Sequence, residues 1–362
     1  MEPKNRLNEV EEKVNDQIAR VRRRGGRLKD EVVTLSHGAG GKASAALLDH
    51  VFFDIYGNQL LEQSSDSTVV TVEGERLAFS TDGYVVSPIE FPGGSIGELA
   101  VNGTVNDLAV AGAEPRYLSV AFILEEGLEI ETLRRVVVKL REAADTAGVH
   151  IATGDTKVVP KGAADKLYIT TSGIGVIPRG RELGFERVAV GDRIIVSGPI
   201  ADHGMSVMMA RGDLAIDAPI ESDSREVASL VKKLFDDRID VHWMRDATRG
   251  GLATVMNELA ETTELGIALE DEKIPVRPMT RAACDILGID PLYVANEGTF
   301  AAVVAEADAT AAVEALRAAG ADGAAVIGRV VDKPVASVVL LTGFGGARMV
   351  DKLVGDPLPR IC

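Results

Sequence analysis

The chain ends on a cysteine, Cys362, in the segment 355–362, which reads Gly-Asp-Pro-Leu-Pro-Arg-Ile-Cys. No residue follows this thiol, and Pro357 and Pro359 stiffen the segment and exclude a helix. Such a segment can carry its sulfur away from the body of the protein and into a cleft. The pattern indicates a covalent carrier arm or a nucleophile that visits an active site. Chain ends are usually disordered and tolerant of change, so the cysteine alone leaves the alternative of no role open.

Acidic residues beside small or polar residues form a second group that could do chemistry. We expect each of them at a strand end or a turn, where an adjacent glycine lets the backbone approach a ligand closely. Carboxylates on separate loops are the hard oxygen ligands that Mg²⁺ bound to a polyphosphate requires. A single Asp-Gly pair most often marks only a turn, but five such places in one chain predict a metal–nucleotide site. They are centred on Asp82, Asp107, Asp155, Asp246 and Glu297.

Two basic features accompany these carboxylates. The glycine-rich segment His37–Lys42 precedes an expected helix, and exposed amides at a helix start attract phosphate. Its spacing is not that of a Walker A loop, so a flexible loop before the helix remains the alternative. Lys157 follows Asp155 by two positions, so in a strand both side chains would share a face. The alternative for this pair is a surface ion pair, which contributes little to stability. The histidines show no spacing typical of a zinc site.

Composition limits the classes of protein that fit. A length of 362 residues predicts two domains. The net charge of −16 argues against nonspecific nucleic-acid binding but not against a nucleotide held by local cations and amides. No apolar run reaches the ~18 residues of a membrane span, and the start lacks a signal-peptide pattern. Two cysteines, of which Cys284 lies in a run typical of a core helix, fit a reducing cytoplasm rather than a disulfide framework.

The hydrophobic pattern predicts strands and helices that alternate without a regular repeat in two halves of similar size, which favours an α+β fold with mixed or antiparallel sheets. The expected helices are Ala43–Val51, Ser95–Ala111, Glu131–Ala147, His203–Arg211, Ser224–Phe235, Gly251–Thr262 and Thr280–Leu287. The expected strands are Leu77–Ser80, Leu118–Leu124, Leu167–Ile177, Asp192–Gly198, Tyr293–Ala295, Phe300–Val304, Ala325–Arg329 and Ser337–Leu341. We expect an extension at 1–31, domains at 32–178 and 179–345, and a mobile tail at 346–362.

The first thirty residues differ from the rest because they are rich in lysine and arginine on an acidic protein. Apolar residues recur there at helical spacing, which favours a partly formed amphipathic helix. Two interpretations remain open, a solvated extension and a docking arm for an acidic partner.

Taken together, the motifs resemble the PurM-like ATP-binding superfamily, and within it the HypE family of NiFe-hydrogenase maturation proteins. The resemblance covers roughly residues 34–362 and does not include the N-terminal extension. The stretches that carry it are Ser36–Gly41, Ser80–Val86, Phe91–Gly94, Gly103–Ala109, Gly154–Val159, Arg245–Gly251, Ala295–Gly298 and the tail Pro359–Cys362. The tail is the most diagnostic of these, because purine-pathway relatives lack it.

The resemblance implies a two-domain PurM-like fold that forms a homodimer through its N-terminal halves and binds ATP and Mg²⁺. It implies that a HypF-type carbamoyltransferase loads a carbamoyl group onto the terminal cysteine. The chain then dehydrates this thiocarboxamide to a thiocyanate in a reaction that uses ATP, and the cyano group passes to iron on a HypC–HypD complex. No nucleic acid or membrane takes part.

The roles implied for individual residues follow from that reaction. Cys362 carries the group, Glu297 is the candidate base, and Lys157 supplies positive charge. The candidate nucleotide-binding residues are Gly40, Gly41, Asp82, Asn106 and Asp155. The candidate metal ligands are Asp82, Asp107, Asp155 and Asp246.

Two other functions stay open at this stage. One is a different PurM-like enzyme that acts on a free small molecule, for which the tail would be dispensable. The other is a thiol carrier that binds nucleotide only for regulation, for which Glu297 would be dispensable.

Overall fold

The computed structural model describes residues 28, 30–38, 41–63, 65–212, 219–353 and 360–362. The predictions for residues 1–27, for Gly40 and for the prolines of the tail lie outside these residues. Among the described residues, no helix combines the length and apolar character that a membrane crossing requires.

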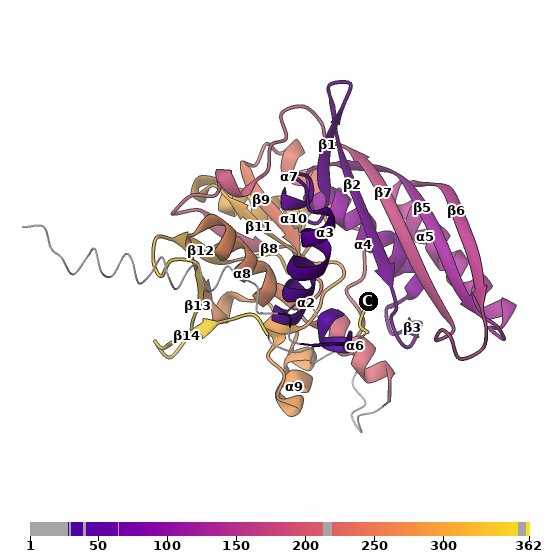
Figure 1. Cartoon of the computed structure of the whole chain (residues 1–362). Helices are drawn as coiled ribbons and strands as arrows, with labels where there is room; N and C mark the ends of the chain where they lie inside the picture. Colours follow the sequence, from indigo (N-terminus) through magenta and orange to yellow (C-terminus); the bar gives the residue numbers. More distant parts are fainter. Residues whose placement is uncertain (1–27, 29, 39–40, 64, 213–218, 354–359) are drawn as a thin grey trace, which may run out of the picture.

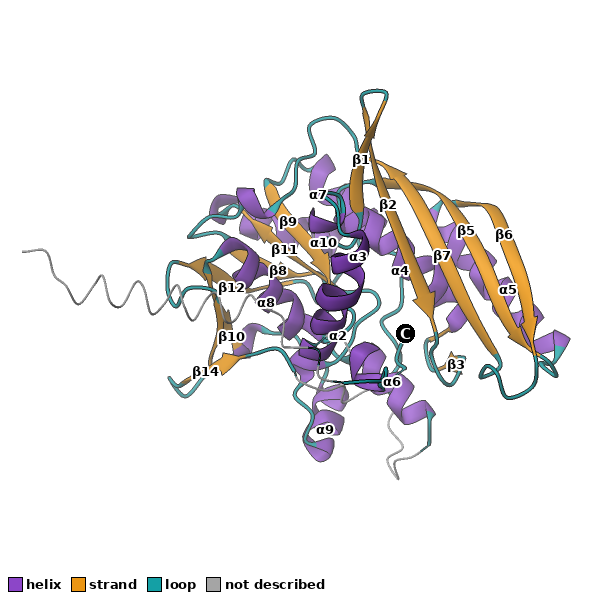
Figure 2. Cartoon of the chain, in the orientation of Figure 1, coloured by secondary structure: helices purple, strands orange, loops and turns teal. Residues whose placement is uncertain are grey.

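The first half of the chain forms a sheet of five strands with helices on one face (Figures 1 and 2). The strand order is β1-β2-β7-β5-β6, in which β5 and β6 run parallel and the other neighbours antiparallel. The strands are β1 (Thr68–Val72), β2 (Glu75–Tyr84), β5 (Glu114–Glu125), β6 (His150–Val159) and β7 (Leu167–Val176). A short separate hairpin joins β3 (Glu90–Phe91) to β4 (Gly94–Ser95).

The second half forms a sheet of seven strands in the order β14-β13-β10-β12-β8-β11-β9. Here β10 and β13 are parallel and the other neighbours antiparallel. The strands are β8 (Arg193–Val196), β9 (Val241–Asp246), β10 (Gly266–Glu270), β11 (Phe300–Val304), β12 (Ala325–Val331), β13 (Ser337–Leu341) and β14 (Ala347–Val350). The mixed sheets confirm the predicted α+β class.

Helix α4 (Ile96–Val110) lies between the two halves (Figure 1) and contacts β2 and β7 of one sheet and β9 of the other. Thirteen of its 15 residues are buried, and its sequence is apolar or small on all sides, which suits a helix enclosed by other layers. Helix α5 (Ile130–Ala147) covers α4 and is amphipathic, and it ends at Gly148, whose φ of 67° suits glycine. Two polar residues of α4, Asn102 and Asn106, contact Ser224 and Arg225 of the second half.

The remaining helices belong to the second half and to the start of the described chain. They are α2 (Lys42–Leu47), a π-helix (Leu48–Phe53), α3 (Asp54–Tyr56), α6 (Asp202–Ala210), α7 (Ala228–Asp236), α8 (Gly251–Thr263), α9 (Pro278–Leu287) and α10 (Ala309–Ala318). Short 3₁₀ turns lie at Leu35–Gly38, Leu61–Gln63, Phe185–Arg187, Asp271–Lys273, Pro291–Tyr293 and Glu306–Asp308.

Several sequence predictions need correction. Tyr293–Ala295 is not a strand, because Asp290 accepts a hydrogen bond from the Leu292 amide and Pro291 opens a 3₁₀ turn there. The expected acidic turns are also partly wrong, since Asp82 and Asp155 lie within strands and Asp107 lies within α4. Strand β14 pairs with β13, so the segment assigned to the tail begins inside the second sheet.

The C-terminus lies between the two halves, beside α6 and close to β3 (Figure 1). Its position places the terminal residues next to the seam that α4 occupies.

Candidate active site

Three carboxylates meet at the seam between the two sheets. Asp66 directly precedes β1, Asp107 projects from α4, and Asp246 ends β9. One carboxylate oxygen of each lies within 4.8 Å of the others. The Ser80 hydroxyl on β2 donates to Asp107 Oδ2 at 2.5 Å, which fixes this carboxylate toward the cluster. The sequence predicted two of these three residues, and it missed Asp66.

Arg245 holds the missed carboxylate. Its Nε donates to Asp66 Oδ1 at 2.8 Å, and its Nη1 lies 2.7 Å from Glu258 Oε2. Asp66 Oδ2 is buried and has no hydrogen-bond partner among the described residues. An unpaired buried carboxylate oxygen is costly unless a ligand satisfies it.

The cluster is electrostatically strained. The pKa of Asp66 is raised to about 6, chiefly by burial; Arg245 lowers it, and Glu258 and Asp82 contribute to the increase. Burial, then Asp82, Asp246 and Asp66, raise the pKa of Asp107 well above its usual range. Burial and Asp66 do the same to the pKa of Asp246. Adjacent buried carboxylates cannot all ionise without a compensating cation, so this donor set fits a hard divalent cation such as Mg²⁺.

Asp82 faces the same seam. Successive residues of β2 alternate between the two faces of the sheet, and Ser80, Asp82 and Tyr84 share the inner face. The Tyr84 hydroxyl donates to Asp82 Oδ2 at 3.2 Å. Asp82 lies close enough to raise the pKa of Asp66, Asp107 and Glu297. It therefore interacts electrostatically with both the carboxylate cluster and the predicted base.

Glu297 is buried, with 3% of its surface exposed, in the turn that precedes β11. Its amide and that of Gly298 donate to the two oxygens of Asp223 at 3.0 and 3.1 Å. A side chain at Gly298 would collide with the Asp223 backbone, so glycine is required there. Burial, then Asp246, Asp223 and Asp82, raise the pKa of Glu297 well above its usual range, while Arg249 acts in the opposite direction. A carboxylate of this kind suits proton transfer near neutral pH.

The terminal thiol reaches the same seam. Arg249 Nη2 donates to Cys362 Sγ at 3.2 Å. Arg249 lies in the turn before α8, in which Gly250 and Gly251 have φ of 78° and 61°, angles that suit glycine. Burial raises the pKa of the Cys362 thiol, Arg249 lowers it, and Glu297 and Asp82 raise it. The thiol, the base and the carboxylate cluster therefore share one site.

Arg249 gives the first testable prediction. Replacing Arg249 with Gln removes the positive charge beside Cys362, so we expect the pKa of the thiol to rise further. The pH dependence of Cys362 alkylation by iodoacetamide, followed by intact mass, measures this shift. Arg249→Lys should keep much of the wild-type pKa, and Arg134→Gln on the exposed face of α5 should not change it. A thiol pKa that is equal in Arg249→Gln and wild type would contradict the assignment.

Asp155 and Lys157 are not part of this site within one chain. They form an ion pair with each other on β6, the edge strand, which is exposed along its length. The register aligns Asp155 with Ala121, Thr170 and Gly83 across the sheet. Three strand spacings of about 4.8 Å separate β6 from β2. The alignment also puts both side chains on the outer face, opposite to Asp82.

Two predicted nucleotide-binding residues make contacts within the chain. The Asn106 amide group donates to the carbonyls of Arg225 and Glu297 and accepts from the Val227 amide. Gly41 packs against Leu353, whose carbonyl a Cβ would strike. Asn106 therefore positions the turn of Glu297, and the contact of either residue with phosphate stays a prediction.

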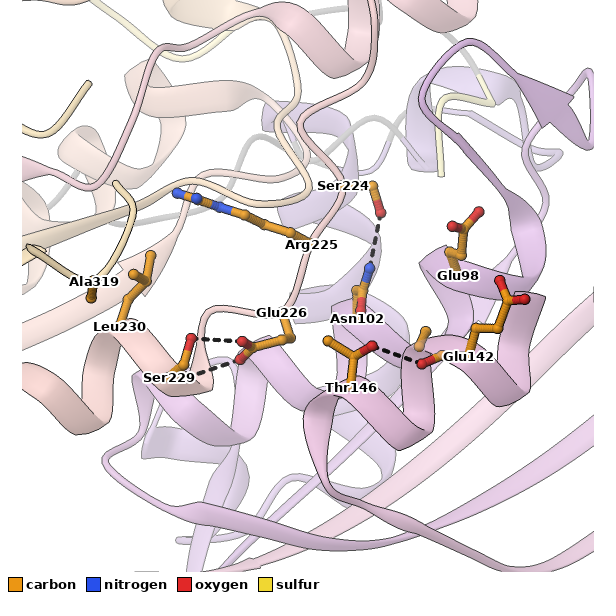
Figure 3. A pocket seen from close by; sticks show the side chains of 11 residues that line it. Glu98, Asn102, Glu142, Thr146, Ser224, Arg225, Glu226, Ser229, Leu230 and Ala319 are labelled. Atoms are coloured by element: carbon orange, nitrogen blue, oxygen red, sulfur yellow. Dashed lines mark hydrogen bonds between the residues drawn. The ribbon is translucent and has the colours of Figure 1, made fainter. Parts of the chain in front are cut away.

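A separate hollow of ≈ 410 Å³ lies between α4, α5 and α7 (Figure 3). Glu98, Glu142 and Glu226 line it with a single arginine, Arg225. This acidic lining disfavours a triphosphate, which carries the same sign of charge. We therefore do not assign nucleotide binding to this hollow.

Comparison with known proteins matches both halves of the chain. The family described as "AIR synthase related protein, N-terminal domain" matches residues 64–177, and its C-terminal counterpart matches residues 189–340. The carbamoyl dehydratase HypE of Rhodobacter capsulatus is 51% identical over 339 residues, which cover 92% of this chain and 99% of that protein. The chain belongs to the HypE carbamoyl dehydratase family.

Solved structures of HypE proteins have the same fold. A HypE–HypF complex matches with a TM-score of 0.81 and 41% identity, covering 85% of this chain and all of that one. HypE in complex with ATP matches with a TM-score of 0.76 and 43% identity over 91% of this chain and all of that one.

The structure adds three site residues that the sequence did not single out. Asp66 completes the carboxylate cluster, Arg249 contacts the thiol, and Asp223 holds the turn of Glu297. Asp66 directly precedes the β-branched run of β1, which is a strand signal that could have identified it. Arg249 belongs to the motif Arg245–Gly251, from which the sequence argument selected only Asp246. No local sequence pattern marks Asp223, because its role depends on a hydrogen bond to the Glu297 amide, 74 residues further along the chain.

Proposed function

We propose that this chain dehydrates a carbamoyl group carried on its own Cys362 to a thiocyanate in an ATP-dependent reaction, and so supplies the cyano ligand of NiFe-hydrogenase iron. The observation that carries this proposal is the contact between Arg249 and Cys362 Sγ at the site of Glu297 and the carboxylate cluster. A terminal cysteine held at such a site is itself a substrate.

The reaction must turn the oxygen of an amide into a leaving group and remove two N–H protons. ATP bound with Mg²⁺ supplies a phosphoryl group to that oxygen, so the oxygen leaves as phosphate and no free water forms. Asp66, Asp107 and Asp246 would hold Mg²⁺, and Asp82 extends this acidic surface toward the thiol. The atoms balance because the thiocarboxamide loses one oxygen to phosphate and two protons to bases.

Glu297 accepts a proton from the substrate nitrogen. Its raised pKa means that the ionised form takes up a proton readily, and the Arg249 guanidinium nearby acts to lower this pKa. The Asp223 carboxylate holds the backbone of this turn and so fixes the direction from which the base approaches.

Arg249 orients the carbamoyl group. The carbonyl oxygen of a group on Cys362 lies two bonds from Sγ, within reach of a guanidinium that already contacts the sulfur. A guanidinium at this oxygen stabilises the negative charge that accumulates there as the phosphoryl group is transferred.

We further propose a homodimer whose second copy supplies Asp155 and Lys157. Phe79, Ile174 and Tyr117 align across the outer face of the first sheet and are 48%, 42% and 53% exposed. Figure 2 shows helices on only the other face of this sheet. An exposed apolar row beside a long unpaired edge strand is typical of an interface.

The same arrangement explains the position of Lys157. If two sheets close face to face about a two-fold axis, β6 of one copy lies beside the β1–β2 edge of the other. Lys157 then lies at the β1–β2 edge of the partner, where a positive charge that reaches around this edge to the carboxylate cluster on the partner's inner face would offset a transferring phosphoryl group.

The partners follow from the chemistry. HypF is the proposed donor of the carbamoyl group, and a HypC–HypD complex is the proposed acceptor of the cyano group. We place the reaction in the cytoplasm, because a reducing compartment keeps the terminal thiol free.

Intact-mass spectrometry tests the proposed function. The full chain is loaded with a carbamoyl group on Cys362 and incubated with ATP and Mg²⁺. We expect this adduct to lose the mass of one water molecule, and we expect no loss without ATP or in a Cys362→Ala chain that still binds ATP. An adduct that survives ATP unchanged would overturn the proposal. Unimpaired turnover of a free small molecule by a chain without residues 359–362 would favour a different PurM-like enzyme.

A further inference from the structure

The last three residues are bound by the rest of the chain through their backbone as well as through the thiol. The Val85 amide donates to an oxygen of the terminal carboxylate of Cys362 at 3.1 Å, and the Ser87 amide donates to the Arg360 carbonyl at 3.3 Å. This pattern is a short stretch of strand-like pairing with the segment that follows β2. It fixes the direction and the register of the terminal residues.

Two side chains, one in α6 and one at its end, bind backbone carbonyls of the tail. Arg211 at the end of α6 donates to the Arg360 carbonyl at 2.7 Å and to the Ser87 carbonyl at 2.8 Å, so it joins the tail to the segment that pairs with it. His203 is fully buried, and its Nε2 lies 3.0 Å from the Ile361 carbonyl. A carbonyl only accepts hydrogen bonds, so Nε2 carries the proton, and Nδ1 accepts from the Ser222 hydroxyl at 2.8 Å.

Side chains of the tail are recognised separately from its backbone. Ile361 is 5% exposed and packs into the same apolar core as Leu99 and Met205. Arg360 forms an ion pair with Asp165 at 2.9 Å, and its Nε donates to the Val85 carbonyl at 3.1 Å. A separate site thus receives each of the three terminal residues.

The backbone of Arg360 gives independent support for specific binding. Its φ of 56° lies in the left-handed region, which costs free energy for a residue with a side chain. Such a conformation persists only where surrounding contacts determine it. The contacts that do so here are those to Arg211, Asp165 and Val85.

We propose that these groups form a peptide-binding site that recognises the sequence Arg-Ile-Cys, so that it binds a separate peptide with this ending as well as the tail of the chain. We call it the tripeptide site, and it consists of Val85, Ser87, Asp165, His203 and Arg211 together with the apolar pocket around Ile361. Binding of the peptide does not depend on the proposed function. The expectation that a bound S-carbamoyl peptide is a substrate rests on that function.

Competition in the full chain tests the proposal. The attached tail has an effective concentration in the millimolar range, so a competing peptide must be supplied at millimolar concentration or above. The probe is the acetylated peptide Leu-Pro-Arg-Ile-Ser, and the readout is the rate of Cys362 alkylation by iodoacetamide, which needs neither ATP nor dehydration. We expect the peptide to release the half-buried thiol from its contact with Arg249 and raise this rate several-fold. The scrambled peptide Ile-Leu-Arg-Pro-Ser should leave the rate unchanged, and equal effects of the two peptides would overturn the proposal.

Variants separate recognition from folding. Arg211→Ala and Asp165→Asn should each raise the alkylation rate, and Arg134→Ala on α5 is the matched control. Ile361→Asp changes only the tail, so the rest of the chain should stay folded. The alkylation rate should nevertheless rise to that of a fully exposed thiol, as in an unfolded chain. If Ile361→Asp alkylates as slowly as wild type, Ile361 is not held in its pocket and the proposal is wrong.

A turnover experiment then tests whether a bound S-carbamoyl peptide is dehydrated, separately from whether the peptide binds. A Cys362→Ser chain is given a Leu-Pro-Arg-Ile-Cys peptide that carries an S-carbamoyl group, with ATP and Mg²⁺. We expect a peptide thiocyanate. Competition without turnover would support the tripeptide site and count against the proposed function, whereas turnover equally fast with the scrambled sequence would count against recognition.

Discussion

Replacing Glu297 with Gln is expected to lower the single-turnover rate of dehydration by about 10²- to 10⁴-fold, the contribution typical of a general base. The substitution keeps the size of the side chain and removes its capacity to accept a proton. Both contacts to Asp223 come from backbone amides, so the turn should keep its position. Intact mass of the carbamoyl adduct, sampled over time, measures the rate.

The pH dependence identifies the group that acts. Glu297 accepts a proton only when it is ionised, and burial together with Asp246, Asp223 and Asp82 raises its pKa well above the usual range. The wild-type rate should therefore increase as the pH rises through this elevated pKa and fall as the pH drops below it. The Gln variant should lack this limb of the profile.

A matched control guards against a general effect of removing acidic charge. Glu226→Gln alters a carboxylate that accepts hydrogen bonds from the amide and hydroxyl of Ser229, at the start of α7, and it should retain the wild-type rate and pH profile. A Glu297→Gln chain that dehydrates its adduct at the wild-type rate would remove Glu297 from the mechanism. The thiol carrier that binds nucleotide only for regulation would then be the better interpretation.

The sequence predicted the fold class because its strongest signals are local. The stripe of α5 and the stop at Gly148 give that helix almost to the residue, and the small apolar residues of α4 predict a helix at the same place. Strand β6 was missed because it is exposed on both faces, so no alternation of apolar and polar residues marks it. The turn at Pro291 was read as a strand because apolar character alone does not distinguish the two.

The site was predicted in part for the same reason. Glycine-bounded motifs identify Asp246 and Glu297, and the end of the chain identifies Cys362. A strand signal marks the neighbourhood of Asp66, but its place beside Asp107 and Asp246, like that of Arg249 beside Cys362, becomes evident only in the folded chain, because these partners lie far away in the sequence. Position within the fold also decides a point that sequence could not, namely that Lys157 lies on the face opposite to Asp82.

A mixed dimer of two inactive variants is expected to recover about half of the wild-type activity, because a two-fold dimer has two equivalent sites and one of them would be complete. Lys157→Ala and Glu297→Gln are each assayed alone, and the mixed dimer is obtained by co-expressing the two variants with different affinity tags and purifying on both tags in turn. In the mixed dimer, the Lys157→Ala chain provides Glu297 and its partner provides Lys157, so one site holds both residues. The other site lacks both.

The recovery of activity depends on which chain supplies Lys157 to a site, and not on how much Lys157 or Glu297 contributes to the rate. If Lys157 served the site of its own chain, each site of the mixed dimer would carry one defect and no activity would return. Lys157 cannot serve that site without crossing the sheet, because its side chain lies on the outer face and two strands, β7 and β5, lie between β6 and β2. A mixed dimer without activity would therefore leave Lys157 as a partner of Asp155 on an exposed edge. Recovery that disappears when Phe79→Asp breaks the outer face would connect the shared site to the dimer itself.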